Sequence, residues 1–533
     1  MLHNSTPGAN PNVAPERYSR FWFRFFEILP GASVWSFICL PFILSVNHPL
    51  TVTLYILAFD SYWVVNAFSY AQLMLRGFYR LRANMGRDWQ EQLDATLKLS
   101  PEQWQAEKFI DWREVYQAVI LATYKEDQGI LEESIDSVIA ADFPKERMLF
   151  VLATEGRAAE QVRPIAASLR EKYASHFHTF IVTEHPDDIL GEVKAKGANV
   201  TWAARKLTDE MEKLNIPLDR VVVSTADADT RFHASYFLCL TYLYATLPDR
   251  VNCAFQPVCM YFNNIWDTPA FSRLMALSTT LWTMMESVRD YRLITFSTHA
   301  MSLRTLVDID YWCTTIVNED SRQFFRAWFH YDGKFRNVPL FVPIYMDAVS
   351  VGNFRGTLRN LYLQQQRWAY GVEHFPYIVL ESFRRKRIPL MDRVMRVYRA
   401  FQGAFSWATS SFTVSVVGWI PILLNSKFRN EVPVANFIVV TKTLLSLTWI
   451  GLIVSAYIMV KILPPVPKGK KHISLFLASQ WILVPFISVL YSIPGLHAQT
   501  RLMFGKYLGF RVTEKARTPS LDSALAATGA PRA

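Results

Sequence analysis

The stretch Val221–Thr230, VVVSTADADT, joins an apolar run to two aspartates, Asp227 and Asp229, that are separated by one residue. The apolar run is typical of a buried strand, and residues i and i+2 at its end lie on the same side. Two carboxylates held this close repel each other, which raises the cost of ionising both. A divalent cation removes that cost, since Mg²⁺ or Mn²⁺ is held by one or two carboxylates together with substrate phosphates. The alternative is a solvated turn, because aspartate is common where strands end.

The chain around this stretch alternates short apolar runs with charged, helical stretches. This alternation predicts an α/β domain with a mostly parallel sheet over residues 100–375. Ligands of such sheets bind at the carboxyl ends of the strands, which is where Asp227 and Asp229 lie. The predicted strands are Ala118–Ala122, Met148–Ala153, Thr179–Val182 and Val221–Ser224, and the predicted helices include Asp127–Ala140 and Lys194–Leu214.

Apolar, uncharged runs on both sides of this domain predict membrane spans. The chain has 533 residues, of which 51% are hydrophobic, and a mean hydropathy of +0.10, so it is too apolar to be only soluble. Residues 31–75 predict a transmembrane hairpin that turns at Asn47 to Pro49, and residues 403–496 form a C-terminal transmembrane region. This region contains three runs, Gly403–Leu424, Thr443–Val460 and Ile473–Leu496. The last run contains Pro485 and is either re-entrant or a kinked span.

Basic residues predict how the chain is oriented. Arginines lie on both sides of the hairpin, so both flanks, including the N-terminal segment 1–30, are expected in the cytoplasm. The domain that follows is then cytosolic, and the protein is integral to a plasma or inner membrane. Residues 376–402 predict amphipathic interface helices that face lipid headgroups. The tail, residues 497–533, is also basic and favours the inside, although three C-terminal spans would place it outside.

The net charge of +10 limits the partners. The basic residues cluster beside apolar runs, which favours an anionic membrane surface and argues against nucleic acid. The five cysteines form no C-x-x-C pair, so neither a disulfide framework nor a zinc site is predicted.

Three further segments accompany the D-x-D pair. Asn318, Glu319 and Asp320 follow an apolar stretch and precede a predicted helix. The segment LYLQQQRWAYG has a Q-x-x-R-W spacing that places its polar and aromatic side chains on one helical face. The segment ILATYKEDQG reads as a strand and turn and carries Glu126. In this order, and flanked by membrane spans, these motifs resemble the membrane-embedded family 2 glycosyltransferases, such as cellulose, chitin and hyaluronan synthases, over residues 115–375.

The resemblance implies a GT-A-like fold and a role for each matching residue. Asp227 and Asp229 match the motif that binds a metal and the donor diphosphate, and Asp320 matches the catalytic base. In the Q-x-x-R-W match, the arginine contacts the donor pyrophosphate and the tryptophan lies beside the acceptor sugar. The residues implied in substrate binding are Glu126, Glu155, Lys196, Asn199, Glu319, Gln364, Arg367 and Trp368.

The sequence also departs from the family pattern. Asn318 replaces the usual threonine before Glu319. Thr154, Glu155 and Gly156 replace the usual D-D-G, which leaves the contact to the nucleobase open. The segment STHAMSLRT, residues 297–305, stands where G-S-x-A-x-x-R-R is common, so acceptor recognition differs from that of cellulose synthase.

The resemblance implies an integral membrane, inverting hexosyltransferase that uses Mg²⁺ or Mn²⁺. The donor would be a nucleotide sugar, expected to be UDP-linked, and the acceptor a growing polysaccharide or a lipid-linked molecule. Membrane lipids are expected partners, and a homo-oligomer or an export partner stays open. The alternative is a catalytically weak, glycosyltransferase-like membrane protein that acts in partner binding or transport.

Overall fold

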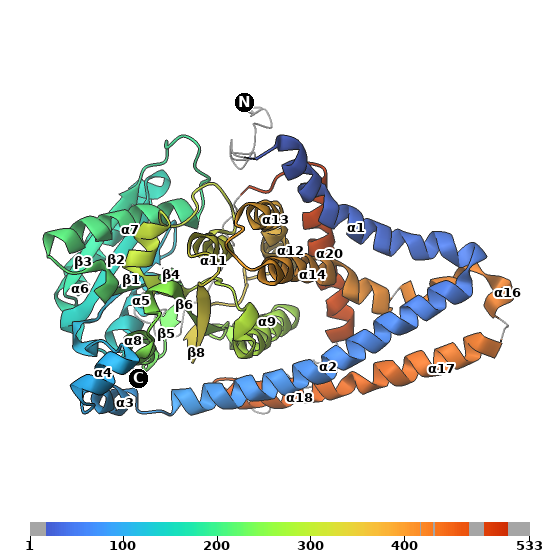
Figure 1. Ribbon diagram of the computed structural model, residues 1–533, viewed down its shortest axis with the longest axis horizontal. Coiled ribbons are helices and arrows are strands. Elements are labelled where there is room, and N and C mark those ends of the chain that lie inside the picture. The colour runs from blue at the N-terminus through green and yellow to red at the C-terminus, as the bar shows by residue number, and fades with distance from the viewer. Residues whose placement is uncertain (1–17, 416, 430–431, 468–483, 510–533) are drawn as a thin grey trace, which may run out of the picture.

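The computed structural model describes residues 18–415, 417–429, 432–467 and 484–509. Figure 1 shows a sheet covered by helices and, beside it, long helices that project away from the sheet. A third group of helices lies between these two parts. This intermediate group consists of α12 (Phe354–Ala369), α13 (His374–Arg384), α14 (Leu390–Ser415) and α20 (Val484–Met503).

Within the described residues, eight strands form one mixed sheet in the order β3-β2-β1-β4-β7-β6-β8-β5. The first four neighbours are parallel, but β7 runs antiparallel to β4 and β6, and β5 runs antiparallel to β8. The prediction of a mostly parallel sheet is therefore wrong. The antiparallel strands gave no clear signal in the sequence, because β7 has only four residues and β5 only two, and both carry polar side chains. The strands are β1 (Tyr116–Ala122), β2 (Met148–Glu155), β3 (Thr179–His185), β4 (Val221–Asp227), β5 (Arg231–Phe232), β6 (Cys253–Met260), β7 (His299–Ser302) and β8 (Arg336–Tyr345).

Helices cover both faces of this sheet. Val119 and Leu121 of β1 pack on one face with α5 and α6, whereas Ala118 and Ile120 pack on the other face with α7. Because both faces are covered, the strands are buried throughout and read as continuous apolar runs. The helices of this part are α5 (Gln128–Ile139), α6 (Ala159–Tyr173), α7 (Lys196–Lys213), α8 (Tyr236–Thr246), α9 (Ala270–Val288), α10 (Leu303–Asp308) and α11 (Glu319–His330).

The helices α1 (Arg20–Asn47) and α2 (Pro49–Met85) are joined by His48 and meet at the end of the projecting part (Figure 1). The 37 residues of α2 extend for about 55 Å, which exceeds the roughly 30 Å of a bilayer core. Its C-terminal half therefore reaches the sheet domain, where Gly77 approaches α9 so closely that a Cβ would lie 2.7 Å from the carbonyl oxygen of Met284. The short helices α3 (Trp89–Thr96) and α4 (Pro101–Glu107) follow.

Three helical segments in the described part of the chain are long and apolar enough to cross a membrane: α1, α2 and Asn436–Ile462. A fourth candidate is bent by 48° between Leu390–Thr413 and Val417–Leu424. Part of the predicted run Ile473–Leu496, residues 473–483, lies outside the described residues. The remainder belongs to α20, which runs across the long axis of the molecule and packs against α14. The other C-terminal helices are α15 (Ile420–Leu424), α16 (Ser426–Arg429), α17 (Val432–Leu447) and α18 (Trp449–Ile462).

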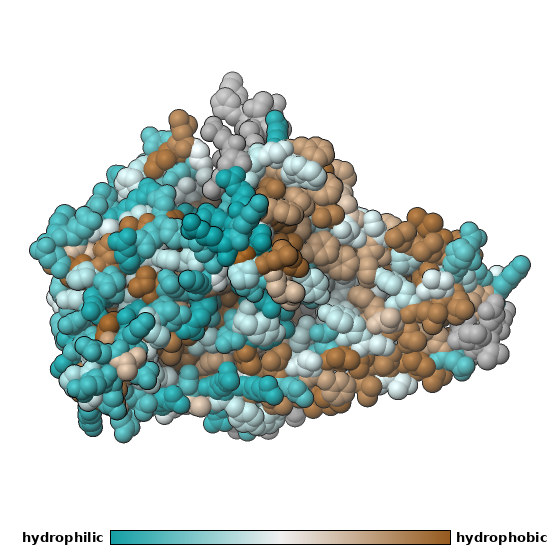
Figure 2. All heavy atoms as spheres, in the orientation of Figure 1, coloured by the Kyte–Doolittle hydropathy of each residue, from teal (hydrophilic) through white to brown (hydrophobic). Residues whose placement is uncertain are grey.

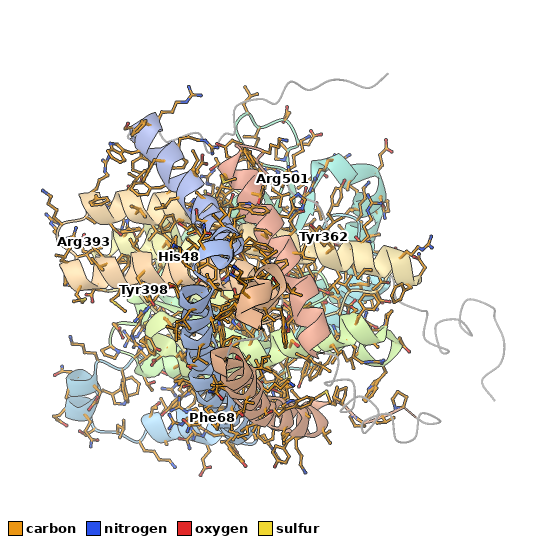
Figure 3. The ribbon with its side chains drawn as sticks, turned by 90° about the vertical axis from the view of Figure 1, so that its right-hand side faces the viewer. His48, Phe68, Tyr362, Arg393, Tyr398 and Arg501 are labelled. Carbon is orange, nitrogen blue, oxygen red and sulfur yellow. The ribbon has the colours of Figure 1, made fainter. Side chains whose placement is uncertain are left out.

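The surface changes character along the molecule. Hydrophobic side chains gather over the projecting helices, whereas the sheet domain is mostly hydrophilic (Figure 2). In Figure 3, α12, which carries Tyr362, and α14, which carries Arg393 and Tyr398, run across the direction in which α1 and α2 project. The intermediate helices thus lie at the base of the apolar part, where an amphipathic helix can lie along a membrane surface.

Candidate active site

A cavity of about 980 Å³ lies between the sheet and the intermediate helices. Its strand end is formed by the carboxyl ends of β1, β2 and β4 with the first turn of α11 and part of α12. Its helix end is formed by α9, α14 and α20. The structure brings all the site residues that the sequence predicted to this cavity: Glu126, Glu155, Lys196, Asn199, Asp227, Asp229, Glu319, Asp320, Gln364, Arg367 and Trp368.

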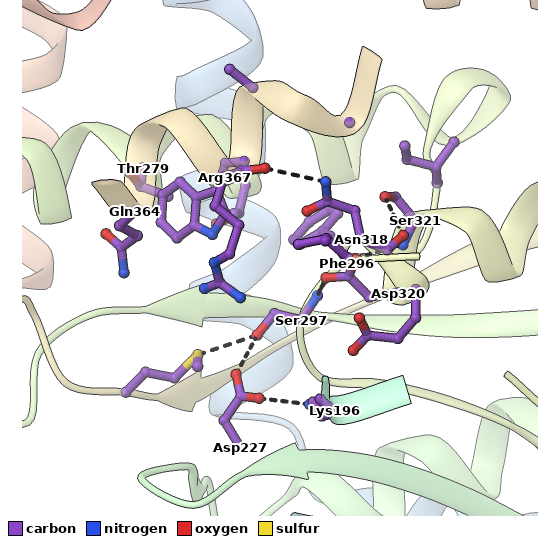
Figure 4. Close-up of a pocket in the computed structure, with 18 of the residues that line it drawn as sticks. Lys196, Asp227, Thr279, Phe296, Ser297, Asn318, Asp320, Ser321, Gln364 and Arg367 are labelled. Atoms are coloured by element: carbon purple, nitrogen blue, oxygen red, sulfur yellow. Dashed lines mark hydrogen bonds and ion pairs between the residues drawn. The ribbon is translucent and has the colours of Figure 1, made fainter. Parts of the chain in front are cut away.

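Asp227 is the last residue of β4 and contacts two side chains from other segments. Lys196 Nζ lies 2.6 Å from Asp227 Oδ1, and Ser297 Oγ donates a hydrogen bond of 3.3 Å to Asp227 Oδ2 (Figure 4). Burial lowers the pKa of Lys196, but the nearby charges of Asp227, Glu319 and Asp320 raise the pKa above its ordinary value. The ammonium group therefore stays charged within the cavity.

Asp320 lies in the first turn of α11, where both carboxylate oxygens accept hydrogen bonds from backbone N–H groups. The N–H of Ser297 donates to Oδ2 at 2.7 Å, and the N–H of Ser321 donates to Oδ1 at 2.7 Å. Ser297 has a φ of +49°, an uncommon conformation for a residue with a side chain. This backbone geometry lets Ser297 contact Asp227 and Asp320 together, a role that the sequence did not reveal.

Asp229 is buried two residues beyond Asp227 and lies beside a second aspartate. The backbone N–H of Asp347 donates to Asp229 Oδ2 at 3.0 Å, and Asn263 Nδ2 donates to the Asp229 carbonyl oxygen at 2.9 Å. Asp347 follows the apolar strand β8 and lines the cavity, but sequence reasoning missed it. The signal was the one that singled out Asp227, namely an aspartate directly after an apolar run.

Asn318, which precedes the first residue of α11, connects α11 to the Q-x-x-R-W helix. Its Nδ2 donates to the carbonyl oxygen of Arg367 at 3.1 Å and to Glu373 Oε1 at 3.4 Å. The Asn318 backbone N–H also donates to Glu373 Oε1, at 3.3 Å. These hydrogen bonds therefore fix α11, which carries Asp320, relative to α12, which carries Arg367.

Glu319 is buried next to Asp320. Burial, followed by the negative charge of Asp320, raises the pKa of Glu319 to about 8. The side chain is therefore mostly protonated at neutral pH, which limits the negative charge at this point of the cavity.

Three of the predicted binding residues hold the loops that follow the strands. Glu126 Oε2 accepts hydrogen bonds from Thr123 Oγ1 at 2.8 Å and from the N–H of Tyr124 at 2.7 Å. Asn199 Nδ2 donates to the Ala153 carbonyl oxygen at 2.9 Å. Glu155 forms an ion pair with Arg157, whose guanidinium carbon lies 4.0 Å from the centre of the Tyr124 ring. These contacts shape the wall between β1 and β2.

The Q-x-x-R-W motif lies on α12, which begins where Asn353 Oδ1 accepts a hydrogen bond from the N–H of Gly356. The guanidinium of Arg367 points towards the space above Asp227 (Figure 4). Trp368 packs against Tyr261, with 6.1 Å between ring centres. On another side of the helix, Tyr362 hydrogen-bonds His497 of α20 at 2.7 Å, so α20 helps to fix the position of the motif.

The helix end of the cavity contains functional candidates that the sequence analysis did not single out. One face of α14 lines the cavity. Along the helix, this face carries two arginines, then an apolar stretch and then a tryptophan. A signal was present in the sequence, because these residues follow a spacing of three and four, as one face of a helix does. They are Arg396, Arg399, Ala400, Gly403, Ala404 and Trp407.

The strand end has ligands that suit a divalent cation. In the part of the chain that the structure describes, no group of three or more His, Cys, Asp or Glu side chains is arranged to hold a metal. Mg²⁺ and Mn²⁺ accept carboxylate oxygens together with water and phosphate oxygens, so the pair Asp227 and Asp229 beside an open cavity fits such an ion. Lys196 shows that this position already accommodates a positive charge against Asp227.

Residues 222–463 match the glycosyl transferase family group 2. The matched range contains the D-x-D pair, the Asn-Glu-Asp segment and the Q-x-x-R-W helix, but it spans less than half of the chain. The match supports a family 2 glycosyltransferase domain. No curated protein matches the chain.

Three solved structures show distant similarity. The mannosyltransferase PcManGT from Pyrobaculum calidifontis, in complex with GDP-Man and Mn²⁺, is 13% identical over 75% of this chain and 98% of that chain, with a TM-score of 0.36. TarS 1-349 of S. aureus, in complex with UDP-GlcNAc, is 12% identical over 75% and 94%, with a TM-score of 0.35. GalNAc-T7 with UDP, GalNAc and Mn²⁺ is 9% identical over 58% of each chain, with a TM-score of 0.28.

Proposed function

We propose that this protein is an integral membrane, inverting glycosyltransferase that transfers a sugar from a nucleotide-sugar donor to a polysaccharide or lipid-linked acceptor. The observation that carries the proposal is the convergence of eleven predicted residues, from segments far apart in the sequence, on one cavity. The match of residues 222–463 to family group 2 supports the same reaction class.

The residues at the strand end suit a single displacement. The acceptor hydroxyl oxygen attacks the anomeric carbon of the donor and forms the new glycosidic bond, while the bond from that carbon to the diphosphate oxygen breaks. The electron pair of the broken bond leaves with the nucleoside diphosphate, and the hydroxyl proton passes to the carboxylate of Asp320. One displacement inverts the anomeric centre.

The leaving diphosphate needs positive charge beside it. Arg367 can hold two of its oxygens with its planar guanidinium, and Lys196 supplies a second cation from α7. Asp227 and Asp229 would hold Mg²⁺ or Mn²⁺, which when bound stabilises the charge that develops on the diphosphate. Ser297 keeps Asp227 and Asp320 at a fixed separation through its two hydrogen bonds.

The arrangement of the helices supports a cytosolic active site. The start of α1 and the end of α2 both lie on the side of the sheet, while His48 lies at the opposite end. Together with basic flanks that favour the cytoplasm, this arrangement supports a cytosolic position for the sheet domain and a membrane position for α1 and α2. The last turn of α20, which carries Arg501, lies beside the start of α1, because Arg24 donates to the carbonyl oxygen of Leu502 at 2.8 Å, and this supports the same side of the membrane for both segments.

A turnover assay with the full chain tests this function. The purified protein in lipid nanodiscs is incubated with labelled UDP-sugars and GDP-sugars, with Mn²⁺ or Mg²⁺ and with a membrane lipid extract as the acceptor source. We expect one nucleotide sugar to be consumed, and Asp229→Asn to reduce the rate at least about 10²-fold, because several kcal/mol of charge stabilisation are lost.

Asp209→Asn provides the matched control, because Asp209 is exposed and lies 3.5 Å from Lys206 on the outer surface of α7. This variant should keep the activity of the unaltered protein. Failure of the unaltered protein to bind any nucleoside diphosphate or to consume any nucleotide sugar would contradict the proposal. That result would favour the non-enzymatic alternative.

A further inference from the structure

The helix end of the cavity has a charge pattern that a neutral sugar chain does not explain. Arg292, Arg396 and Arg399 all border the cavity there. Glu286 lines the same wall, but it is already paired with Arg289 and, at 3.2 Å, with Arg292. The arginines outnumber the carboxylate, so this end carries a net positive charge.

Arg396 is held in an unusual environment for a cation. Its guanidinium carbon lies 4.8 Å from the ring centre of Phe324 and 5.1 Å from that of Trp328. No ion pair or hydrogen bond joins Arg396 to another residue that the structure describes. Arg399 stacks on Tyr291 at 4.9 Å and donates to the Tyr291 carbonyl oxygen at 2.9 Å. Aromatic rings fix both guanidinium groups without neutralising their charge.

Beyond these arginines the cavity wall becomes apolar. Ala400, Gly403 and Ala404 follow on the same face of α14, and a Cβ added to Gly403 would meet no atom within 4 Å. The facing helix α20 contributes Val484, Ser488 and Tyr491, and the Ser488 hydroxyl donates to the Val484 carbonyl oxygen at 2.8 Å within the helix. Trp407 and Tyr491 stack with 5.0 Å between ring centres, where the apolar stretch ends. The wall therefore offers space for a hydrocarbon chain next to a site for an anion.

Exposed aromatic side chains lie at this end of the cavity. Trp282 borders the cavity and is 47% exposed, and Tyr291 beside Arg399 is 61% exposed. Exposed tryptophan and tyrosine side chains are enriched at the level of lipid headgroups. Trp282 lies on α9, and Tyr291 lies in the turn that follows α9. This helix packs against α2, which is long enough to cross a membrane.

We propose that the helix end binds a lipid with a phosphate headgroup, held by Arg396 and Arg399, whose hydrocarbon chain lies between α14 and α20. This inference rests on the proposed function and names the acceptor as a phosphate-linked lipid instead of a neutral polysaccharide. Arginine suits this task because its planar fork binds two phosphate oxygens at once. The headgroup then presents its hydroxyl towards Asp320 through the same cavity.

Binding of simple probes tests the proposal without knowledge of the natural acceptor. The full-length protein in neutral detergent is given labelled hexadecyl phosphate, hexadecanol or inorganic phosphate, and the retained probe is measured. We expect hexadecyl phosphate to bind at least about ten-fold more tightly than either of the other probes, because only it fills both parts of the site.

Variants locate the bound probe. Arg399→Gln and Arg396→Gln should each weaken hexadecyl phosphate binding about ten-fold, while Arg396→Lys, which keeps the charge, loses less. Gly403→Phe fills the apolar stretch, so it should weaken hexadecyl phosphate binding and leave inorganic phosphate binding unchanged. Arg387→Gln is the control, because it removes a charge from an 87% exposed side chain near the same helices. It should bind the probe as the unaltered protein does.

Two outcomes would overturn the proposal. Equal binding of hexadecyl phosphate and hexadecanol would show that the arginines do not recognise phosphate. Loss of binding in Arg367→Ala, with normal binding in Arg399→Gln, would place the probe in the donor site. Labelled UDP and GDP are measured on the same samples, so intact nucleotide binding without lipid selectivity rejects this inference while the proposed function stands.

Discussion

The two ends of the cavity solve the problem of buried charge in different ways. At the strand end, Lys196 pairs with Asp227, and backbone N–H groups bind both oxygens of Asp320. At the helix end, Arg396 lies over the rings of Phe324 and Trp328 and forms no ion pair with any described residue. The charged groups of the strand end are thus already held in place for a reaction in which negative charge moves to the leaving group. The arginines of the helix end, in contrast, need an anionic ligand to balance their charge.

The largest expected effect concerns the strand end. Asp320→Asn keeps the shape and the backbone hydrogen bonds to one oxygen, but it cannot accept a proton from the acceptor. We expect the transfer rate to fall by about 10² to 10⁴-fold while the affinity for nucleoside diphosphate changes little. Initial rates and nucleotide binding are measured on the same preparation.

Asp310→Asn is the matched control for this change, because Asp310 is exposed and pairs with Arg205 away from the cavity. It should leave both quantities unchanged. Normal transfer by Asp320→Asn would show that Asp320 is not the catalytic base. The difference between the two ends would then not reflect catalysis at the strand end.

A smaller effect is expected from the link between the two motifs. Asn318→Ala removes the hydrogen bonds from the side chain to Arg367 and Glu373, so α11 and α12 can shift relative to each other. We expect the rate to fall about ten-fold, because small displacements of reacting groups are costly. Asn318→Thr should recover part of the rate by returning a hydroxyl donor.

Asn360→Ala on α12 serves as the comparison, since Asn360 donates to the Gly356 carbonyl oxygen within that helix. An unaltered rate in Asn318→Ala would show that the Asn318 side chain has no positioning role.

The residues that line the strand end could be selected from the sequence because they follow local rules. Asp227 and Asp229 follow an apolar run. Arg367 and Trp368 belong to a Q-x-x-R-W spacing that can be recognised without knowledge of the tertiary contacts. The parallel neighbours β1 to β4 were predictable for the same reason. β7 was not, since four residues that include His299 and Ser302 give no apolar signal, and its direction depends on contacts with β4 and β6.

The helix end could not be predicted because its residues meet only in three dimensions. Arg396 acquires its environment from Phe324 and Trp328, which lie on a different helix. Ser297 could be named from the sequence, but its positive φ and its contacts with two aspartates could not. The predicted interface region, residues 376–402, also gave no indication that α14 continues to Ser415 and lines the cavity along one face.

A further expected effect is on stability as a function of pH. The folded protein keeps a proton on Glu319 up to a pKa of about 8, whereas an exposed glutamate loses it near 4.5. Between these values the folded state binds one more proton than the unfolded state, so the free energy of unfolding falls as pH rises, by about 1.4 kcal/mol for each pH unit. Above pH 8 this contribution stays constant.

Thermal unfolding in detergent at pH 6, 7 and 8 measures this dependence. The Tm of the unaltered protein should fall by a few degrees more across this range than that of Glu319→Gln, which cannot ionise. Parallel pH profiles of the two proteins would show that Glu319 is already ionised when folded, and that the strand end holds more negative charge than proposed.

Nucleoside diphosphate binding tests most directly whether the strand end is a donor site distinct from the helix end. Binding of labelled UDP and GDP, with Mn²⁺ present, is measured for the unaltered protein, Arg367→Ala and Arg399→Gln by equilibrium dialysis in nanodiscs. We expect one of the two nucleotides to bind, Arg367→Ala to weaken that binding at least about ten-fold, and Arg399→Gln to leave it unchanged. Equal affinity in the unaltered protein and Arg367→Ala would contradict the account.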